Sequence, residues 1–231
     1  MSLPLIAGLY PYTRGGVARP PVVTLQEIPA SLRVNPLYRE QLIVLAGDRD
    51  SAEHLEGFGL RVHRVFDDAP AWVQRDAAHL MKHWMCLWAL AELGDCLWVD
   101  WDTVCIREPD DELAARVRSS ASPRFIRIPN YWATVNCGVY YAHASWAEPM
   151  NRSFEATVSE PNDELLWRAV LPPDVLERPE FWWSTEAVHV EQFDQIPLVQ
   201  ADTYFAHVKN LDWAEAIRAG AARATDGSAR G

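Results

Sequence analysis

Two short acidic sequences in the chain could each hold a metal ion: Asp48-Arg49-Asp50 and Asp100-Trp101-Asp102. Asp50 stands directly before Ser51-Ala52-Glu53 and a helical pattern, so its carboxylate can accept backbone N–H groups at the start of a helix. We therefore interpret the first copy as a helix cap, with metal binding as the less favoured alternative.

The second copy has no helix behind it, because Thr103, Val104 and Ile106 continue a β-branched, strand-like stretch. Side chains alternate across a strand, so Asp100 and Asp102 are predicted to point to one side and Trp101 to the other. Two like charges at the end of a buried strand repel each other unless one protonates or a cation lies between them. A hard divalent cation, Mn²⁺ or Mg²⁺, is the predicted ligand. The alternative is a solvated strand end with two surface acids.

The elements around this pair place it at the edge of a sheet. Apolar residues recur at three- and four-residue steps from Ala71 to Leu93, which predicts a helix that ends at Gly94. Cys96 to Val99 follows as a strand that is apolar on both faces, as expected for the middle of a sheet. In open α/β sheets, ligands bind beyond the carboxyl ends of the strands, where Asp100 and Asp102 fall.

Short apolar runs alternate with amphipathic segments along the chain, which predicts an α/β fold with a mixed, mostly parallel sheet flanked by helices. Val22 to Leu32 fits either a strand or a helix. We predict one unit over residues 1–213 and a flexible tail over 214–231, which is rich in Ala, Gly, Arg and Ser. The other expected elements are strands at Leu3–Tyr10, Gln41–Ala46, Leu60–Phe66, Phe125–Ile128, Gly138–Ala142 and Tyr204–Val208, helices at Asp50–Phe58, Asp110–Val117 and Asn162–Val170, and a loop at Pro11–Pro21.

Composition limits the possible partners. The formal net charge of -11 would repel a phosphate backbone, so long nucleic acid is an unfavourable partner. The four cysteines show no Cys-x-x-Cys spacing and are interpreted as reduced thiols. We find no secretory signal and no apolar run as long as a membrane span, which favours a cytoplasmic protein. Some of the eleven Trp are expected to line a cleft.

Four segments, in order, resemble the GT-A glycosyltransferases, in particular glycogenin and the bacterial lipopolysaccharide galactosyltransferases. Lys82 to Asp102 is similar to the family's Lys-bearing helix and the strand that ends in its Asp-x-Asp motif. Asn136 to Tyr141 resembles its Asn-Ser-Gly-Val strand, with Cys137 in place of Ser. Asn162 to Trp167 looks like its Asp-Gln-x-x-Leu-Asn helix start. His207-Val208-Lys209 resembles its late His and Lys, at a closer spacing.

This resemblance implies a GT-A, Rossmann-like fold and a hexosyltransferase-like enzyme that uses Mn²⁺ or Mg²⁺. The donor would be a nucleotide sugar, with a UDP-sugar as the favoured donor, and the transfer would retain the anomeric configuration. The acceptor stays open. The candidate site residues are Asp100, Asp102 and His207 for the metal, Tyr10, Tyr12, Lys82, Asp100, Trp101, Gly138 and Lys209 for the donor, and Asp163 and Asn136 for catalysis. Tyr10 and Tyr12 are included because they follow the first predicted strand, where a base could stack.

Several of these residues have structural alternatives. Asn136 and Gly138 could mark a strand bulge instead of a sugar pocket. Asp163 or Glu164 could serve the first turn of a helix, and we assign the site role to Asp163. Tyr10 and Tyr12 could stack on a base or simply pack, and Lys209 could be a solvated strand-edge lysine.

Three further readings remain open. Trp182-Trp183 could form a platform for an acceptor sugar or belong to a packed loop. His79, His83 and Cys86 lie at helical spacing that could suggest zinc, which is the minority interpretation. The alternative functions are a non-catalytic nucleotide- or carbohydrate-binding module and a sugar nucleotidyltransferase, for which Arg14-Gly15-Gly16 is a faint phosphate loop.

Overall fold

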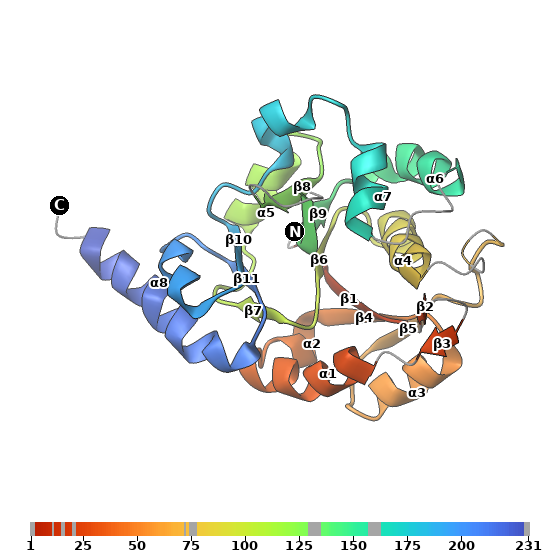
Figure 1. The fold of residues 1–231 in the computed structure, drawn as a ribbon, viewed down its shortest axis with the longest axis horizontal. Coiled ribbons are helices and arrows are strands. Elements are labelled where there is room, and N and C mark those ends of the chain that lie inside the picture. The colour runs from red at the N-terminus through yellow and green to blue at the C-terminus, as the bar shows by residue number, and fades with distance from the viewer. Residues whose placement is uncertain are drawn as a thin grey trace.

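The computed structural model describes residues 3–10, 12–14, 17–19, 22–71, 73, 78–128, 135–156 and 163–228 of the 231. The elements are arranged around one large sheet and one small sheet (Figure 1).

The large sheet has six strands in the order β5-β4-β1-β6-β9-β8. The strands β5, β4, β1 and β6 run parallel, β9 runs antiparallel to β6, and β8 runs antiparallel to β9. The predicted mixed, mostly parallel sheet is therefore confirmed, and β6 lies in its interior, as its apolar sequence indicates. The strand bounds are β1 (Leu5–Leu9), β4 (Leu42–Ala46), β5 (Val62–Arg64), β6 (Cys96–Val99), β8 (Arg124–Arg127) and β9 (Val135–Ala142).

Helices cover both faces of this sheet. Alternate side chains along a strand point to opposite faces, so each strand contributes to two apolar clusters, one on each face. On β6, Leu97 and Val99 belong to one cluster and Cys96 and Trp98 to the other. The first cluster is completed by α1 (Val22–Val34), α3 (Arg49–Glu56) and α5 (Asp111–Arg118). The second is completed by α4 (Ala78–Glu92), α6 (Ala147–Ala156) and α7 (Asp163–Val170). Figure 1 shows α1 and α3 below the sheet and α4, α6 and α7 above it.

The small sheet has three strands in the order β10-β11-β7. Its strands are β7 (Thr103–Cys105), β10 (Ala187–Val190) and β11 (Phe205–Val208); β10 runs parallel to β11, and β7 runs antiparallel to it. The chain enters this sheet directly after β6, so the connection from β6 to β7 joins the two sheets. Both acids of the second Asp-x-Asp lie in that connection.

Short elements fill the remaining connections. A two-stranded hairpin of β2 (Tyr12–Arg14) and β3 (Val17–Arg19) lies within the segment that the sequence predicts to be a loop. The ambiguous Val22–Leu32 segment is helical, as part of α1. The short helices are α2 (Tyr38–Gln41), η1 (Ala144–Trp146), η2 (Val175–Glu177), η3 (Pro179–Phe181), η4 (Phe193–Leu198) and η5 (Leu211–Trp213).

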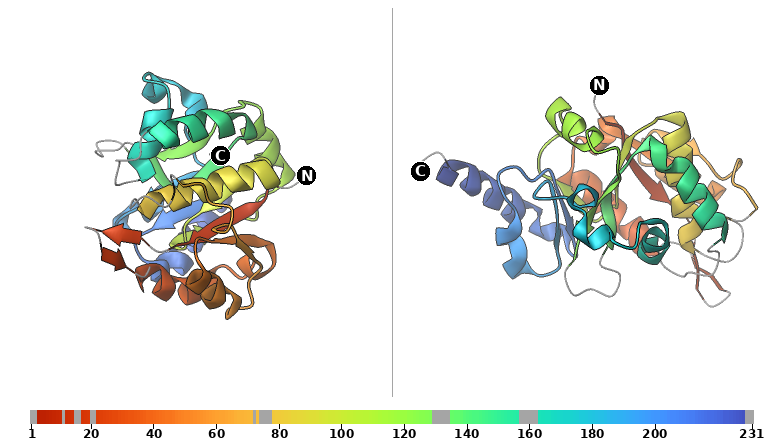
Figure 2. Two further views of the ribbon diagram at one scale, coloured as in Figure 1. Left: turned by 90° about the vertical axis from the view of Figure 1, so that its right-hand side faces the viewer. Right: turned by 90° about the horizontal axis from the view of Figure 1, so that it is seen from above.

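The end of the chain differs from the predicted flexible tail, because α8 (Ala214–Ser228) is a helix. Ala214, Ile217 and Ala221 lie one turn apart on one face and are buried with residues of β11 and η4. Alanine has the highest helix propensity, so the composition that suggested fraying also supports a helix once one face is packed. Figure 2 shows α8 extending away from the large sheet. The division of the chain at residue 213 stays a prediction.

Two further properties concern the described residues. All four cysteines are buried and none forms a disulfide, as the sequence predicts. None of the described helices combines the length and apolar character that a membrane crossing requires.

Candidate metal centre

Asp100, Asp102 and His207 meet where β6 ends and β11 passes. One potential ligand atom from each of the three lies within 4.8 Å of the others, and this is the only such group of His, Cys, Asp and Glu among the described residues. The sequence therefore predicts correctly which acids are brought together with the late histidine. All three are candidate ligands on geometry, and the chain supplies two oxygen donors and one nitrogen donor.

The local backbone differs from the predicted continuous strand. Residues 100–102 form a turn, in which the Thr103 N–H donates to the Asp100 carbonyl oxygen at 3.1 Å. The Asp100 N–H in turn donates to the Gly138 carbonyl oxygen at 2.7 Å, which fixes the turn to β9. The two carboxylates thus share one side because of a tight turn and not because of strand alternation.

Trp101 points away from the two acids, as predicted. Its indole N–H donates to the carbonyl oxygen of Gly8 at 2.9 Å, and the side chain is 3% exposed within the core. This placement favours an anchor that holds the turn against β1 over the predicted contact with a donor.

Lys82 reaches Asp100 from α4. Its Nζ lies 3.0 Å from Oδ1 and 3.1 Å from Oδ2 of the carboxylate, and it also donates to the Cys137 carbonyl oxygen at 3.1 Å. The Trp98 indole N–H donates to Asp100 Oδ1 at 2.7 Å. Lys82 is nearly fully buried, so α4 holds the Asp100 carboxylate from the protein interior.

Asp102 forms an ion pair with His207, with 3.1 Å between Oδ1 and Nε2. Burial raises the pKa of Asp102, but the charge and hydrogen bond of His207 outweigh burial, so the pKa is lowered. Burial lowers the pKa of His207, yet the charge and hydrogen bond of Asp102 raise it above its ordinary value. Asp102 is therefore an anion near neutral pH, and His207 gains its proton more readily than an isolated imidazole.

A second histidine contacts His207 from the neighbouring strand. His189 and His207 are register partners on the parallel strands β10 and β11, and their Nδ1 atoms lie 3.0 Å apart. Burial, and then the charge of His207, lower the pKa of His189 to about 4, so it is neutral. A neutral His189 that accepts the Nδ1–H of His207 leaves Nε2 of His207 directed at Asp102. Such a partner fixes the tautomer of a metal-binding histidine.

Gly138 makes room for His207. A Cβ built at this position would overlap the imidazole ring of His207, at Cγ, Nδ1 and Cδ2. The residue is therefore needed for close packing between β9 and β11. The structure assigns it this packing role, and the predicted donor contact stays a prediction.

Glu27 on α1 is a third acid in the electrostatic neighbourhood of the centre. Burial, followed by repulsion from Asp102 and Asp100, raises its pKa to about 7. No local pattern around Glu27 indicates that α1 lies close to the two acids. For His189 the sequence does offer a signal, because the strands Ala187-Val188-His189-Val190 and Phe205-Ala206-His207-Val208 are similar and carry His at the same position.

Asn136 and Glu164 are buried next to each other near the centre. The Asn136 Nδ2 lies 3.5 Å from Glu164 Oε1, and the Asn136 Oδ1 accepts the Gly138 N–H at 3.1 Å. The pairing of β8 with β9 shifts register here, from Phe125–Tyr140 to Ile126–Asn136, which supports the strand-bulge alternative for this segment. Asp163 begins α7, but its side chain lies outside the described residues.

The remaining predicted residues lie in varied settings. Lys209 is exposed just after β11 and acts electrostatically on His207. Tyr10 is partly buried and packs against the cluster that contains α4. The side chain of Tyr12 lies outside the described part of the chain. Their roles in donor binding stay predictions.

Trp182 and Trp183 belong to a packed loop. Their indole N–H groups donate to the carbonyl oxygens of Val175 and Val139, and both side chains are buried. Burial of both rings favours the packed-loop alternative. Both tryptophans still contribute to the walls of pockets, so the acceptor-platform alternative stays a prediction.

The minority zinc site receives no support from the described residues. His83 and Cys86 are buried, and burial raises the pKa of the Cys86 thiol to about 12, which disfavours the thiolate that zinc binds. The side chain of His79 lies outside the described residues.

The first Asp-x-Asp caps a helix, as predicted, but through a different acid. Asp48 is the N-cap of α3, and its side chain accepts the Ser51 N–H at 2.7 Å. Asp50, to which the sequence analysis gave this role, lies in the first turn and is exposed.

Comparison with known proteins identifies the fold. No protein-family sequence model and no curated protein matches the chain. A solved glycosyltransferase, involved in the glycosylation of the major capsid of PBCV-1, is similar with a TM-score of 0.52 and 12% identity, over 93% of this chain and 99% of that one. A CMP:2-keto-3-deoxy-manno-octonic acid synthetase in complex with CTP gives a TM-score of 0.35 at 10% identity, over 74% and 87%. The chain therefore has the mixed α/β fold of that glycosyltransferase.

Proposed function

We propose that this protein is a metal-dependent glycosyltransferase that moves a sugar from a nucleoside-diphosphate sugar to an acceptor. The observation that carries the proposal is the cluster of Asp100, Asp102 and His207 at the carboxyl end of β6. The fold shared with a solved glycosyltransferase supports it. The GT-A motif order in the sequence, with its Asp-x-Asp, is the second support.

The residues present fit a divalent cation of the Mn²⁺ or Mg²⁺ type. Asp102 and Asp100 offer carboxylate oxygens, and His207 offers Nε2 when it is neutral. Asp100 is already held by Lys82 and Trp98, so we expect Asp102 and His207 to be the stronger ligands. A carboxylate has several acceptor positions, so Asp100 can still share the cation or accept a ribose hydroxyl.

When bound, the cation would act as a Lewis acid that offsets the negative charge of the leaving diphosphate. The chain's own residues would do the rest. Lys82 and Trp98 hold Asp100 in one orientation, and His189 and Gly138 hold His207. Lys209, exposed beside the centre, would contact the diphosphate.

The finer assignments follow from the family resemblance and are part of the proposal. The donor would be a UDP-sugar, transfer would proceed with retention, and Asn136 with Asp163 would approach the sugar. The contact between Asn136 and Glu164 makes Glu164 a second candidate for this role. Glu164 is buried and lies next to Asn136 in the first turn of α7. Asp163, the first residue of that helix, directly precedes it.

The test is a donor panel with a matched pair of variants. Purified protein with Mn²⁺ is incubated with UDP-glucose, UDP-galactose, UDP-N-acetylglucosamine and GDP-mannose, and released nucleoside diphosphate is measured. We expect release from at least one donor, reduced at least about 100-fold in Asp102→Asn and unchanged in Asp50→Asn, which makes the same substitution in the other Asp-x-Asp.

Other outcomes separate the alternatives. Donor binding without any release would indicate a non-catalytic binding module. Formation of a nucleotide sugar from a nucleoside triphosphate and a sugar phosphate would indicate a nucleotidyltransferase. Equal release by wild type and Asp102→Asn would exclude Asp102 as a metal ligand.

A further inference from the structure

A pocket of about 500 Å³ lies between the two sheets and is lined in part by His189, which contacts His207. Its walls come from β8 of the large sheet, β10 of the small sheet, η4 and the segment 183–185. Its volume falls within the range of small-molecule sites.

The pocket is connected to the candidate metal centre through one side chain. His189 lines the pocket, and its Nδ1 contacts Nδ1 of His207 at 3.0 Å. A molecule in the pocket would therefore lie one imidazole ring away from a predicted metal ligand. The pocket and the candidate metal centre are therefore neighbours across His189.

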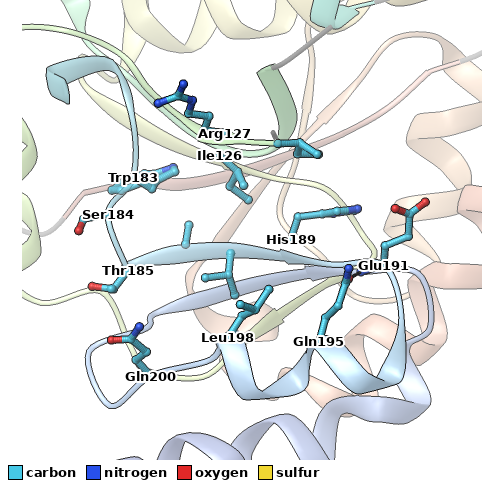
Figure 3. Close-up of a pocket in the computed structure, with 13 residues that line it drawn as sticks. Ile126, Arg127, Trp183, Ser184, Thr185, His189, Glu191, Gln195, Leu198 and Gln200 are labelled. Carbon is cyan, nitrogen blue, oxygen red and sulfur yellow. Dashed lines mark hydrogen bonds between the residues drawn. The ribbon is translucent and has the colours of Figure 1, made fainter. Parts of the chain in front are cut away.

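The polar and apolar groups of the pocket are separated in space. Figure 3 shows Ser184 and Thr185 at one end, His189 and Gln195 at the other, and Leu198 between them. Trp183 closes the wall above, where its indole N–H is held by the Val139 carbonyl oxygen. Hydroxyls and amides at the ends with an apolar middle suit a ligand that has hydroxyl edges and C–H faces.

The charges of the pocket favour an uncharged ligand. Arg127 and Glu191 are the cationic and the anionic side chains in the described lining, so their formal charges cancel. The Arg127 guanidinium lies over the ring of Trp182, with 5.8 Å to the centroid, which gives it a partner within the protein.

We infer that this pocket binds the acceptor, and that the acceptor is a neutral, polyhydroxylated molecule such as a sugar or glycoside. The identification of the ligand as the acceptor rests on the proposed function. The preference for neutral sugars follows from the residues that line the pocket. Polar ends fix the orientation of such a ligand, and the apolar middle packs against its ring.

The test measures sugar binding directly and so does not depend on catalysis. Saturation-transfer NMR is recorded on the full chain with methyl α-D-glucopyranoside, methyl β-D-galactopyranoside and maltose, with glucose 6-phosphate as the charged probe. The test variant is Leu198→Trp, which fills the middle of the pocket from a position that is 53% exposed and tolerant of a larger side chain. The matched control is Leu176→Trp, at an exposed leucine outside the described lining of this pocket.

We expect at least one neutral sugar to bind to wild type and to Leu176→Trp, and to bind at least about tenfold more weakly to Leu198→Trp. Equal binding to Leu198→Trp, no binding of any neutral sugar, or a preference for the phosphorylated sugar would overturn the inference. Release of nucleoside diphosphate without sugar binding would overturn the acceptor pocket and leave the proposed function standing. If wild type binds a neutral sugar, Leu198→Trp loses that binding, and the protein releases no nucleoside diphosphate from any donor, the sugar pocket would stand and the proposed function would be overturned.

Discussion

The chain carries an Asp-x-Asp after two parallel strands of the same sheet, β4 and β6, and uses the two copies differently. After β4 the backbone turns into α3, and Asp48 accepts the Ser51 N–H as a helix cap. After β6 the backbone turns into a second sheet, and Asp100 and Asp102 meet His207 instead. The comparison shows that the element that follows an acidic tripeptide decides whether its carboxylates serve the backbone or remain available to a ligand.

The largest expected difference in stability comes from the buried lysine that supports only the second copy. Lys82→Met removes the partner of Asp100, and we expect a loss of about 2–3 kcal/mol of unfolding free energy. The value is below that of a fully buried pair because the Asp100 side chain is 33% exposed. Urea unfolding measures it, with the exposed Lys209→Met as the control that should change stability little. A loss below about 0.5 kcal/mol in Lys82→Met would mean that the pair does not support the turn.

The close approach of β9 to β11 gives the next effect. Gly138→Ala places a Cβ in the His207 ring, so we expect a loss of about 1–3 kcal/mol and weaker metal binding. Gly220→Ala is the matched control, because its Cβ would lie 3.5 Å from Ile196 Cγ2 and its site on α8 is helical. That variant should be stabilised by about 0.5–1 kcal/mol. Thermal unfolding of both variants would show whether the loss of stability comes from any Gly→Ala substitution or from the overlap with His207 at position 138.

The ion pair between Asp102 and His207 should make the stability of the protein depend on pH. The lowered pKa of Asp102 gives stability that is present above its ordinary value of 3.8 and is lost as pH falls through the lowered value. The raised pKa of His207 gives stability that is present below 6.5 and is lost as pH rises through the raised value.

Without metal, we therefore expect wild type to exceed His207→Gln in stability most clearly between about pH 4 and 6.5, by about 1.5 kcal/mol. Urea unfolding at a series of pH values in a chelator measures the difference. A difference that is constant from pH 4 to 9 would argue against the ion pair.

The smallest effect concerns the first copy. Asp48→Ala removes the side chain that caps α3 and should cost about 1 kcal/mol without changing metal binding or donor hydrolysis. Asp50→Ala should cost less, because Asp50 makes no described cap and only adds negative charge to the first turn. If Asp50→Ala were the more destabilising of the two, the assignment of the cap to Asp48 would be wrong.

Much of the fold could be predicted from local patterns. Residues close together in the sequence determine three of the elements. These are the buried strand Cys96–Val99, the helix that ends before Gly94 and the strand Phe205–Val208. The positive φ of 77° at Gly94 explains why the helix ends there. The two acids could be identified because no helix follows them, and His207 from the family resemblance.

The rest depends on contacts between distant segments. The pairing of β10 with β11 brings His189 to His207, and α1 brings Glu27 close to the acids, although no local pattern around Glu27 indicates this. The sequence does not distinguish the turn at residues 100–102 from a continuous strand, because the β-branched Thr103 and Val104 directly after it favour a strand. Helix α8 was missed because its stability depends on packing against η4.

Direct measurement of Mn²⁺ binding tests the central claim most closely. Titration calorimetry with Mn²⁺ and UDP is performed on wild type, Asp102→Asn and Asp50→Asn, at a pH above the raised pKa of His207 so that Nε2 is free of a proton. We predict that wild type and Asp50→Asn bind Mn²⁺ with equal affinity, and that Asp102→Asn binds at least about 100-fold more weakly. Equal affinity in all three proteins, or a loss in Asp50→Asn alone, would contradict the assignment of the metal centre to the second Asp-x-Asp.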